Sequence, residues 1–435
     1  MSNTEKNFRL NKSKVFCMAP WVSINNNPNG DILPCCVARD GVFGNLYKDS
    51  IEDIWNNEKY KEFRKNILEE KECPQCERCY KEEEWGSMSS YRKHWNQLYY
   101  NKYDELIPNT EPDGHLDSMN LYRWDFRFNN LCNLACVGCG PDYSSSWVEL
   151  KKRMWPNDAD DFKIYSSKEN KENFINTIKT QAKVVDNIYF AGGEPLLHPE
   201  HYEILSELNR LEKLDKVEFM YSTNLTNLYY KDHYIVDYWN KMKRCKVIVS
   251  IDEVDPERLH YIRYPSDRDA IVNNIKIINQ SLNSVDKHWS ITPTWNILNA
   301  HRMKDIIEFF YLNDLFPYAF YNSVAWDVDI ATIILMHPKH LSISIATPEW
   351  KEYLNQKFNE FEEWYIDTLI PLKNSNVRVF ATKIIKGNME KFRNALKESN
   401  ENKNFKFWYQ RMDDVRGTDF CKTFPELTWH IDQLF

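Results

Sequence analysis

The sequence predicts an α/β protein built around a parallel β-sheet, and the order of its apolar segments carries this prediction. Between about residues 121 and 335, short apolar runs alternate with stretches of helical periodicity. Six runs read as strands, at 124–129, 187–191, 216–222, 246–251, 289–297 and 318–325. Helical patterns fall between them, for example around Ile204, Ile271 and Ile306. Six β/α units of this kind imply right-handed crossovers and a parallel sheet.

Length and composition limit the remaining possibilities. A chain of 435 residues can bury a large core and form one or two domains. Its 64 acidic and 56 basic residues give a net charge of −8, which argues against nonspecific binding to nucleic acid or to an anionic membrane. Residues 1–7 lack the apolar core of a signal peptide, and no run reaches the roughly 18 apolar residues of a membrane-spanning helix. We therefore expect a cytoplasmic protein whose eleven cysteines are reduced and available to metal.

The first 100 residues contain six of the cysteines. An Asn29-Gly30 turn between two short apolar runs predicts a β-hairpin that brings Cys17 and Cys35 together at its open end. A helix capped by Ser50 and Asp53 should follow and lead to a C-x2-C pair, Cys76 and Cys79. Four such thiolates close a site for zinc or for a four-iron cluster, and the residues alone leave both open.

The chain beyond this region divides at recognisable signals. Residues 101–120 are predicted to be a linker, because Pro, Asn, Asp and Gly cluster at 108–114. The predicted segments are thus a cysteine-rich domain at 1–100, this linker, the β/α region at 121–335 and a helical C-terminal extension at 336–435.

Two motifs in the β/α region carry the chemistry. Cys132, Cys136 and Cys139 have C-x3-C-x2-C spacing, which supplies three ligands to a cubic cluster and leaves its fourth iron open to a small molecule. About sixty residues later comes Gly192-Gly193-Glu194-Pro195. Each motif follows a strand-like run, where the active-site loops of β/α barrels lie. This pairing strongly resembles the radical S-adenosylmethionine (radical SAM) superfamily, whose fold is a partial (β/α)6 TIM-like barrel.

The resemblance implies roles for individual residues. The three cysteines would hold a [4Fe-4S] cluster whose open iron is chelated by S-adenosylmethionine (SAM), and the residues 192–195 would receive the methionine amino group. Polar residues that end later strands would complete the cofactor site: Ser250, Asp252, Arg263 and Asn296. One departure is Gly138, which stands where the family usually has an aromatic residue near adenine. No catalytic residue beyond the cofactor ligands is expected, although the Cys421 thiol is a candidate hydrogen-atom donor.

The N-terminal cysteines resemble the twitch domain, the short form of the SPASM auxiliary-cluster domain, here placed before the barrel. Because the chain has six cysteines there and the full pattern needs seven, we expect one auxiliary [4Fe-4S] cluster. The preferred ligands are Cys17, Cys35, Cys76 and Cys79, with Cys36 and Cys73 as alternates.

The resemblance predicts an enzyme that cleaves SAM reductively and uses the 5′-deoxyadenosyl radical to abstract hydrogen from a substrate. An electron would come from a flavodoxin- or ferredoxin-type reductant. The favoured substrate is a peptide or protein, as in maturation of ribosomal peptides. A small-molecule dehydrogenase acting on a sugar or aminocyclitol is the alternative within the family. A non-enzymatic zinc or iron–sulfur scaffold is the alternative of a different class.

Overall fold

The computed structural model describes residues 3–38, 41–86, 90–165, 171–322, 333–398 and 404–428. The chain divides into two compact units that interleave along the sequence. Unit 1 comprises residues 1–129, 165–192 and 199–219, and unit 2 comprises residues 130–164, 193–198 and 220–435.

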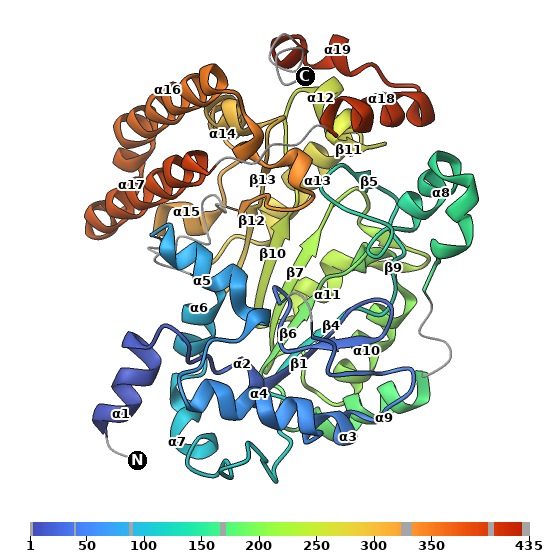
Figure 1. Cartoon of the computed structure of the whole chain (residues 1–435), viewed down its shortest axis with the longest axis vertical. Coiled ribbons are helices and arrows are strands. Elements are labelled where there is room, and N and C mark those ends of the chain that lie inside the picture. The colour runs from blue at the N-terminus through green and yellow to red at the C-terminus, as the bar shows by residue number, and fades with distance from the viewer. Residues whose placement is uncertain are drawn as a thin grey trace. The chain divides into compact units, whose positions relative to one another are not determined.

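Unit 1 has a mixed sheet with the strand order β6-β4-β1-β2-β3. Its strands are β1 (Ser23–Asn26), β2 (Asp31–Leu33), β3 (Gly44–Asn45), β4 (Arg123–Phe126) and β6 (Asn187–Phe190). The predicted hairpin is confirmed, because β1 and β2 pair antiparallel with Asn25 opposite Leu33. On its other side β1 pairs parallel with β4, and β4 pairs parallel with β6 (Figure 1). The N-terminal hairpin is therefore part of the same sheet as two of the predicted β/α strands.

The helices of unit 1 lie before, between and after these strands in the sequence. They are α1 (Asn3–Asn7), α2 (Ala19–Val22), α3 (Ile51–Trp55), α4 (Glu58–Leu68), α5 (Glu77–Glu84), α6 (Tyr91–Leu98), α7 (Tyr103–Leu106), α9 (Lys171–Gln181) and α10 (Pro199–Arg210). The Ser50 hydroxyl accepts a hydrogen bond from the Asp53 amide at 3.1 Å, as the predicted cap requires. The single predicted helix is two, however, because Asn57 caps a second helix by accepting from the Tyr60 amide at 2.9 Å.

Unit 2 contains parallel strands and most of the remaining helices. β10 (Arg244–Val249) lies between β12 (Lys287–Ile291) and β7 (Glu218–Thr223), whose first two residues belong to unit 1. β10 and β12 pair parallel in register from Cys245 opposite Lys287 to Val249 opposite Ile291. The short strands are β5 (Ala135–Cys136), β8 (Tyr229–Tyr230), β9 (His233–Tyr234), β11 (Arg263–Tyr264), β13 (Thr294–Trp295) and β14 (Ile333–Ile334).

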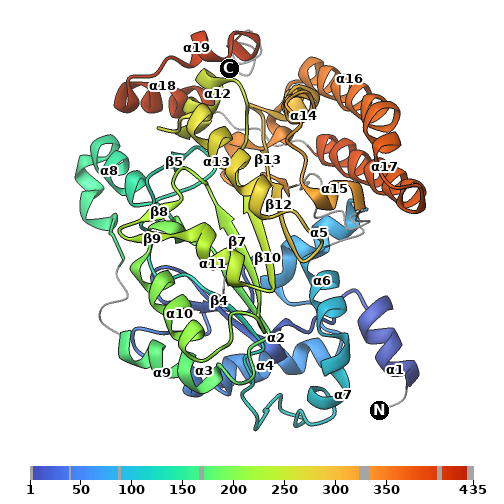
Figure 2. The same cartoon turned by 180° about the vertical axis from the view of Figure 1, so that it is seen from behind.

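The helices of unit 2 continue to the C-terminus. They are α8 (Ser145–Met154), α11 (Ile235–Lys241), α12 (Pro256–Ile262), α13 (Arg268–Ser281), α14 (Met303–Leu312), α15 (Tyr318–Asn322), α16 (Pro348–Trp364), α17 (Ser375–Lys397), α18 (Phe405–Arg416) and α19 (Phe420–Thr423). Helices α16 and α17 lie side by side (Figure 1), and α19 packs beside α12 and α18 (Figure 2). The helical C-terminal segment predicted from periodicity is thus present.

Two strand predictions differ from the structure. The run 289–297 is broken at Pro293, which cannot donate to a ladder, so β12 and β13 are separate strands. Residues 318–322 of the sixth predicted strand form helix α15, and residues 323–325 lie outside the described residues. Tyr and Phe at 318–322 fit an amphipathic helix as readily as a strand, and β14 instead pairs parallel with β13. The parallel α/β architecture holds, whereas a six-unit barrel in full is not seen in the described residues.

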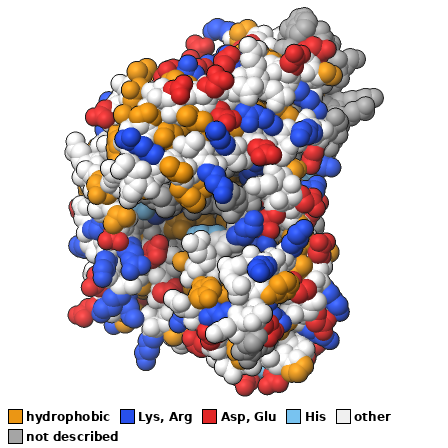
Figure 3. All heavy atoms as spheres, turned by 90° about the vertical axis from the view of Figure 1, so that its left-hand side faces the viewer, with side chains coloured by type: hydrophobic (Ala, Val, Ile, Leu, Met, Phe, Trp, Pro, Cys, Tyr) orange, Lys and Arg blue, Asp and Glu red, His pale blue; other side chains and the backbone are white. Residues whose placement is uncertain are grey.

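The surface carries both signs of charge. On the face drawn in Figure 3, Lys and Arg side chains are interspersed with Asp and Glu. Within the described parts of the chain, no helix combines the length and the apolarity needed to cross a bilayer.

Candidate cofactor site

The three barrel cysteines lie on one loop of unit 2, between β4 and α8. Cys136 is part of β5, which pairs antiparallel with β11 so that Cys136 stands opposite Arg263. The Cys136 carbonyl accepts hydrogen bonds from the Cys139 amide at 3.0 Å and from the Trp147 indole at 2.7 Å. The loop is therefore a tight turn fixed from two sides.

The N-terminus of α8 braces the same loop through three consecutive serines. The Ser144 hydroxyl caps the helix and donates to the Leu134 carbonyl at 2.6 Å. The Ser146 hydroxyl donates to the Cys132 carbonyl at 2.8 Å, and the Ser145 hydroxyl donates to it at 3.1 Å. These contacts hold the three thiols near one another. Burial raises the pKa of both Cys132 and Cys139, and the neighbouring Cys136 thiol raises both further.

The second motif lies directly against the cysteine loop. Gly192 has φ +116°, and a Cβ at Gly193 would overlap the carbonyl oxygen of Leu131. The Glu194 amide donates to that same carbonyl at 2.7 Å. Glycine is therefore required at 193 for close backbone approach, and residues sixty positions apart in sequence meet beside Cys132.

Glu194 is a buried carboxylate held by internal donors. It accepts from the Thr223 hydroxyl and the Asn224 amide, both at 2.7 Å, and from the Leu196 amide at 3.1 Å. Burial raises its pKa to about 7, although these hydrogen bonds pull the pKa down. The carboxylate thus ties the Gly-Gly-Glu-Pro loop to the end of β7.

Asn224 connects the two motifs through its side chain. Its amide nitrogen lies 3.9 Å from the Cys132 sulfur and 2.9 Å from the Asn133 side-chain oxygen. Strand β7 ends at Thr223, and Asn224, which follows it, provides a donor to the first thiol.

Arg263 joins Asp252 to the second thiol. Its Nε lies 2.7 Å from the Asp252 carboxylate and its Nη1 lies 3.7 Å from the Cys136 sulfur. Burial opposes the Arg263 charge, but Asp252 and Cys136 raise its pKa above the ordinary arginine value. The other oxygen of Asp252 accepts from the Thr294 amide at 2.6 Å. Two predicted site residues, Asp252 and Arg263, are therefore a buried ion pair at the cysteine loop.

A second buried arginine lies on the far side of the loop backbone. Arg416, at the end of α18, donates to the carbonyl of Ala135 and, at 3.1 Å, to the carbonyl of Tyr261. Its guanidinium also lies 5.1 Å from the Trp147 ring centroid. Burial lowers the pKa of Arg416 to about 10. No local pattern predicts this contact, because 281 residues separate Arg416 from Ala135.

The remaining predicted residues take mixed positions. Pro195 begins a 3-10 turn beside Glu194, and Ser250 follows β10 with its amide donating to the Thr223 carbonyl at 2.8 Å. Asn296 is buried and its side chain donates to the Thr294 carbonyl at 2.9 Å and accepts from the Leu298 amide at 2.9 Å, so it stabilises a turn. Cys421 is exposed on α19.

Gly138 occupies the position where the family usually has an aromatic residue, and the space beside it is filled by another part of the chain. A Cβ at Gly138 would meet the two methyl groups of Leu335 at 3.4 and 3.6 Å. The apolar surface beside the third cysteine is thus supplied by Leu335, directly after β14.

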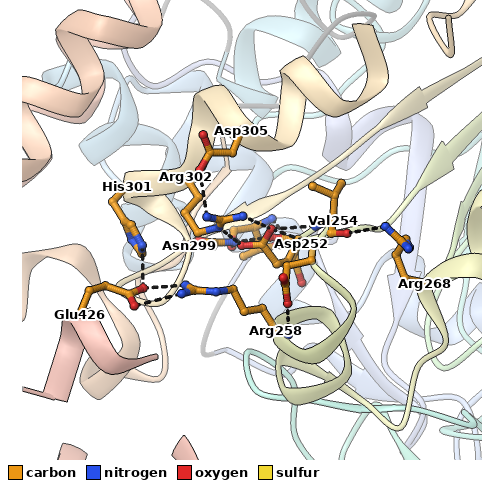
Figure 4. Close-up of polar contacts among 12 residues, drawn as sticks. Asp252, Val254, Arg258, Arg268, Asn299, His301, Arg302, Asp305 and Glu426 are labelled. Atoms are coloured by element: carbon orange, nitrogen blue, oxygen red, sulfur yellow. Dashed lines mark hydrogen bonds and ion pairs between the residues drawn. The ribbon is translucent and has the colours of Figure 1, made fainter. Parts of the chain in front are cut away.

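Charged side chains join Glu426, after α19, to α12 and to the turn at 300–302 (Figure 4). Glu426 accepts from Arg258 of α12 at 2.6 and 3.0 Å and contacts His301 Nε2 at 3.0 Å. Arg302, the next residue, forms an ion pair with the buried Glu253 at 2.6 Å, and Glu253 directly follows Asp252. The Asp252 carbonyl accepts from Asn299 at 2.9 Å. This network fixes the backbone that presents Asp252 to Arg263.

The cysteines of unit 1 form a second group built from separate segments. Cys17 precedes α2, Cys35 and Cys36 follow β2, and Cys76 and Cys79 lie at the start of α5. Burial raises the pKa of Cys35, and the nearby thiols of Cys36, Cys79, Cys76 and Cys17 raise it further. Burial also raises the pKa of Cys76, and the nearby thiols of Cys17, Cys79 and Cys73 raise it further. Cysteines from three separate segments therefore lie near one another, and the choice of Cys17, Cys35, Cys76 and Cys79 as ligands stays a prediction.

The two alternates stand differently. After burial, the charges that most affect the pKa of Cys36 are those of Asp125, Arg127 and Arg123. Cys73 is buried, and burial alone raises its pKa to about 11.

The donor sets fit iron–sulfur clusters better than single ions. Among the described residues, no three His, Cys, Asp or Glu side chains are arranged to hold one metal ion. Thiolates at the corners of a cubane stand further apart than the ligands of one ion, and the three barrel thiols are flanked by donors from Arg263 and Asn224, which suit an anionic cluster.

Comparison with known proteins identifies both regions. A model of the radical SAM superfamily matches residues 126–310, and a model described as an iron–sulfur cluster-binding domain (SPASM) matches residues 17–80. Residues 126–310 are thus a radical SAM domain, and residues 17–80 are a SPASM domain. Radical SAM proteins bind a [4Fe-4S] cluster and SAM, and SPASM domains bind auxiliary iron–sulfur clusters.

Solved structures that resemble the chain are forms of Streptococcus suis SuiB. The free and SAM-bound forms are each 13% identical with a TM-score of 0.29, and cover 55% of this chain and 54% and 55% of theirs. The form bound to precursor peptide SuiA is 12% identical with a TM-score of 0.30, and covers 69% of this chain and 61% of that one. The match thus spans little more than half of SuiB. No curated protein matches the chain.

Proposed function

We propose that unit 2 binds the SAM-chelating cluster through Cys132, Cys136 and Cys139 and receives SAM between the cysteine loop and the Gly-Gly-Glu-Pro loop. The observation that carries this proposal is the direct contact of the two loops, in which the Glu194 amide donates to the Leu131 carbonyl at 2.7 Å. When bound, the cluster and SAM together supply the 5′-deoxyadenosyl radical that removes a hydrogen atom from a substrate.

The chain's own residues prepare the site for these groups. Arg263 is oriented by Asp252 and by Cys136 opposite it, so its charge is fixed before any anion arrives. A guanidinium held in this way offers N–H donors to a carboxylate such as that of methionine. Asn224 plays a parallel part for the first thiol, and Glu194 holds the chain around Asn224 in place.

We further propose that the substrate is a peptide or protein. Helix α17 supports this class, because it exposes the apolar side chains of Val379 and Phe380, which a bound peptide can cover. A sugar or aminocyclitol needs no such surface. A dehydrogenase of a small molecule is the second candidate within the family.

The experiment is reductive cleavage of SAM by anaerobically reconstituted protein. With dithionite the protein should form 5′-deoxyadenosine, and a peptide substrate should carry deuterium from a labelled position into it. The absence of 5′-deoxyadenosine from protein with a full iron complement, under several reductants, would overturn the proposal. Deuterium transfer from a sugar and from no peptide would move the substrate to the second class.

A further inference from the structure

One face of the sheet in unit 1 is polar although it is buried. In β4 the side chains of Arg123 and Asp125 share a face, and Trp124 lies on the other. The parallel register places Ser23 and Asn25 of β1 beside them on one side. Parallel strands normally bury apolar side chains on both faces, so this face needs a separate explanation.

The second neighbour continues the same pattern. In β6, Asn187 stands opposite Arg123 and Tyr189 stands opposite Asp125. Ile188, between them, lies on the apolar face with Trp124. Three adjacent strands thus present polar side chains to one buried side, which a chance substitution does not explain.

Arg123 is the central feature of this face. It is 5% exposed, yet its Nε and Nη1 have no hydrogen-bond partner among the described residues. It also forms no ion pair within them. Its guanidinium lies 5.0 Å from the Trp95 ring centroid and 5.5 Å from that of Tyr189. Stacking of this kind covers the faces of a guanidinium and leaves its N–H edge for an acceptor.

The surrounding atoms are mostly acceptors. The side-chain oxygens of Asn25 and Asn187 are buried without a donor in the described residues. Asp125 is 1% exposed and has Arg127 Nε at 3.5 Å from one oxygen, with the Cys36 thiol beside it. A second carboxylate, Asp186, lies near enough for the Arg123 charge to lower its pKa, although burial raises it. Asp186 accepts a hydrogen bond from the Tyr99 hydroxyl at 3.3 Å. Buried polar atoms are rarely left unsatisfied, because each costs free energy comparable to a lost hydrogen bond.

We propose that this face, centred on Arg123, binds a carboxylate of the substrate, while Asn25, Asn187 and Asp125 accept hydrogen bonds from N–H groups of the same substrate. A peptide C-terminus has this chemistry, since a carboxylate and an amide N–H lie two bonds apart in it. This inference rests on the proposed function, because it takes the bound molecule to be the substrate of that enzyme. It adds which chemical group of the substrate is recognised.

Binding of small probes tests the site without any turnover. The holoprotein with its clusters is titrated under anaerobic conditions with N-acetylglycine and with N-acetylglycinamide, which differ only in the carboxylate, and binding is followed by ligand-observed NMR. A charge-assisted contact predicts that N-acetylglycine binds at least about tenfold more tightly than the amide. Inorganic phosphate is the third probe, and tighter binding of phosphate than of N-acetylglycine would overturn the carboxylate assignment.

Substitution of Asn187 separates binding from folding. In Asn187→Asp a carboxylate appears directly opposite Arg123 and gives it an internal partner. We expect the affinity for N-acetylglycine to fall at least about tenfold, while the iron content and melting temperature are retained or increased.

Two further variants complete the test. Arg123→Met should also lose binding, and if it fails to fold, Asn187→Asp alone decides the matter. Arg210→Met is the matched control, because Arg210 pairs with Glu207 on the exposed side of α10 and should leave probe affinity unchanged. Retention of carboxylate-selective binding by Asn187→Asp, or no selectivity in the wild type, would overturn the proposal.

The outcome is distinguishable from failure of the proposed function. A wild type that forms 5′-deoxyadenosine but does not prefer N-acetylglycine overturns this inference alone. A wild type that binds N-acetylglycine selectively but never forms 5′-deoxyadenosine leaves the carboxylate site standing and overturns the proposed function.

Discussion

The two groups of cysteines are built on opposite plans. Cys132, Cys136 and Cys139 come from one short loop whose backbone is held by the serines of α8, by Trp147 and by Arg416. The unit 1 group comes from a hairpin and from α5, and the thiols of Cys35 and Cys76 have other cysteines of the group as their main electrostatic neighbours. One group is local and surrounded by donors, whereas the other is assembled by the fold.

This difference teaches what each group can do. A three-cysteine loop beside Arg263 and Asn224 has donors ready for a further ligand, which suits a cluster with an open iron. Four thiols from separate segments, if they bind a cluster of their own as we propose, would hold those segments together. The predictions below test that contrast, from the largest expected effect to the smallest.

The loop that carries Cys132, Cys136 and Cys139 should be required for all SAM cleavage. Replacing Cys132, Cys136 and Cys139 together with Ala should abolish 5′-deoxyadenosine formation and remove about four irons per chain, leaving about four. Iron analysis and chromatography of the nucleoside measure both. Cys245→Ala, a buried cysteine of β10 outside both groups, is the control and should keep the full iron content. A triple variant with no iron at all would contradict two independent groups.

The unit 1 group should contribute mainly to folding. Replacing Cys17, Cys35, Cys76 and Cys79 with Ala should remove the other four or so irons and lower the melting temperature, because ligand bonds stabilise a small module. The single variant Cys36→Ala should keep all of its iron, since that thiol faces Asp125. Loss of about four irons from Cys36→Ala would show that the ligand assignment is wrong.

The ion pair at the barrel loop should affect both stability and SAM. Arg263→Gln leaves the buried Asp252 without its partner, so we expect the free energy of unfolding to fall by about 3–5 kcal/mol. SAM affinity should fall about 10- to 100-fold, the range of a charge-assisted hydrogen bond. The double variant Asp252→Asn/Arg263→Gln should regain part of the stability and none of the affinity. Unchanged SAM affinity in both would remove Arg263 from the site.

The C-terminal contact should give the smallest effect and one that depends on pH. Hydrogen bonds from His301 and Arg258 hold the pKa of Glu426 well below its usual range, although burial opposes them. The stabilisation is therefore present above the unfolded pKa of about 4.3 and is lost as pH falls below it.

Glu426→Gln should lower the free energy of unfolding at pH 7 by about 1–3 kcal/mol, with the difference from wild type shrinking toward pH 3. Denaturant unfolding at several pH values measures it. Glu257→Gln, on the exposed face of α12, should show no such difference. A Glu426→Gln effect that is equal at pH 3 and pH 7 would rule out the charge as its cause.

Much of this arrangement followed from local sequence. The hairpin at Asn29-Gly30 and the Ser50 cap were predicted because turn and capping chemistry acts within a few residues. The contact of the cysteine loop with the Gly-Gly-Glu-Pro loop agrees with their expected places after parallel strands. The cofactor roles of Ser250 and Asn296 stay predictions.

Other features depend on contacts that local patterns do not encode. The prediction of a sixth strand was wrong at 318–322, where the chain forms helix α15. A short aromatic run fits the periodicity of a helix and of a strand, so the surrounding structure decides between them. Arg416 and Asn224 were not assigned to the cysteine loop, since the first is a distant surface-type residue in sequence and the second acts through its side chain on Cys132. The polar face around Arg123 becomes visible only when three strands are placed in register.

The parallel pairing of β1 with β4 has a consequence for how this chain is assembled and cut. Asn25 donates to the Asp125 carbonyl at 3.0 Å across 100 residues, so β1 can pair in the sheet only after the much later strand β4 has been made. Contacts of such long range slow folding. A deletion of the N-terminal region would leave β4 as a bare edge strand, which invites aggregation. The region is therefore a permanent part of the sheet, and chimaeras that exchange it should be joined inside the sheet's register, not at the loop that precedes β4.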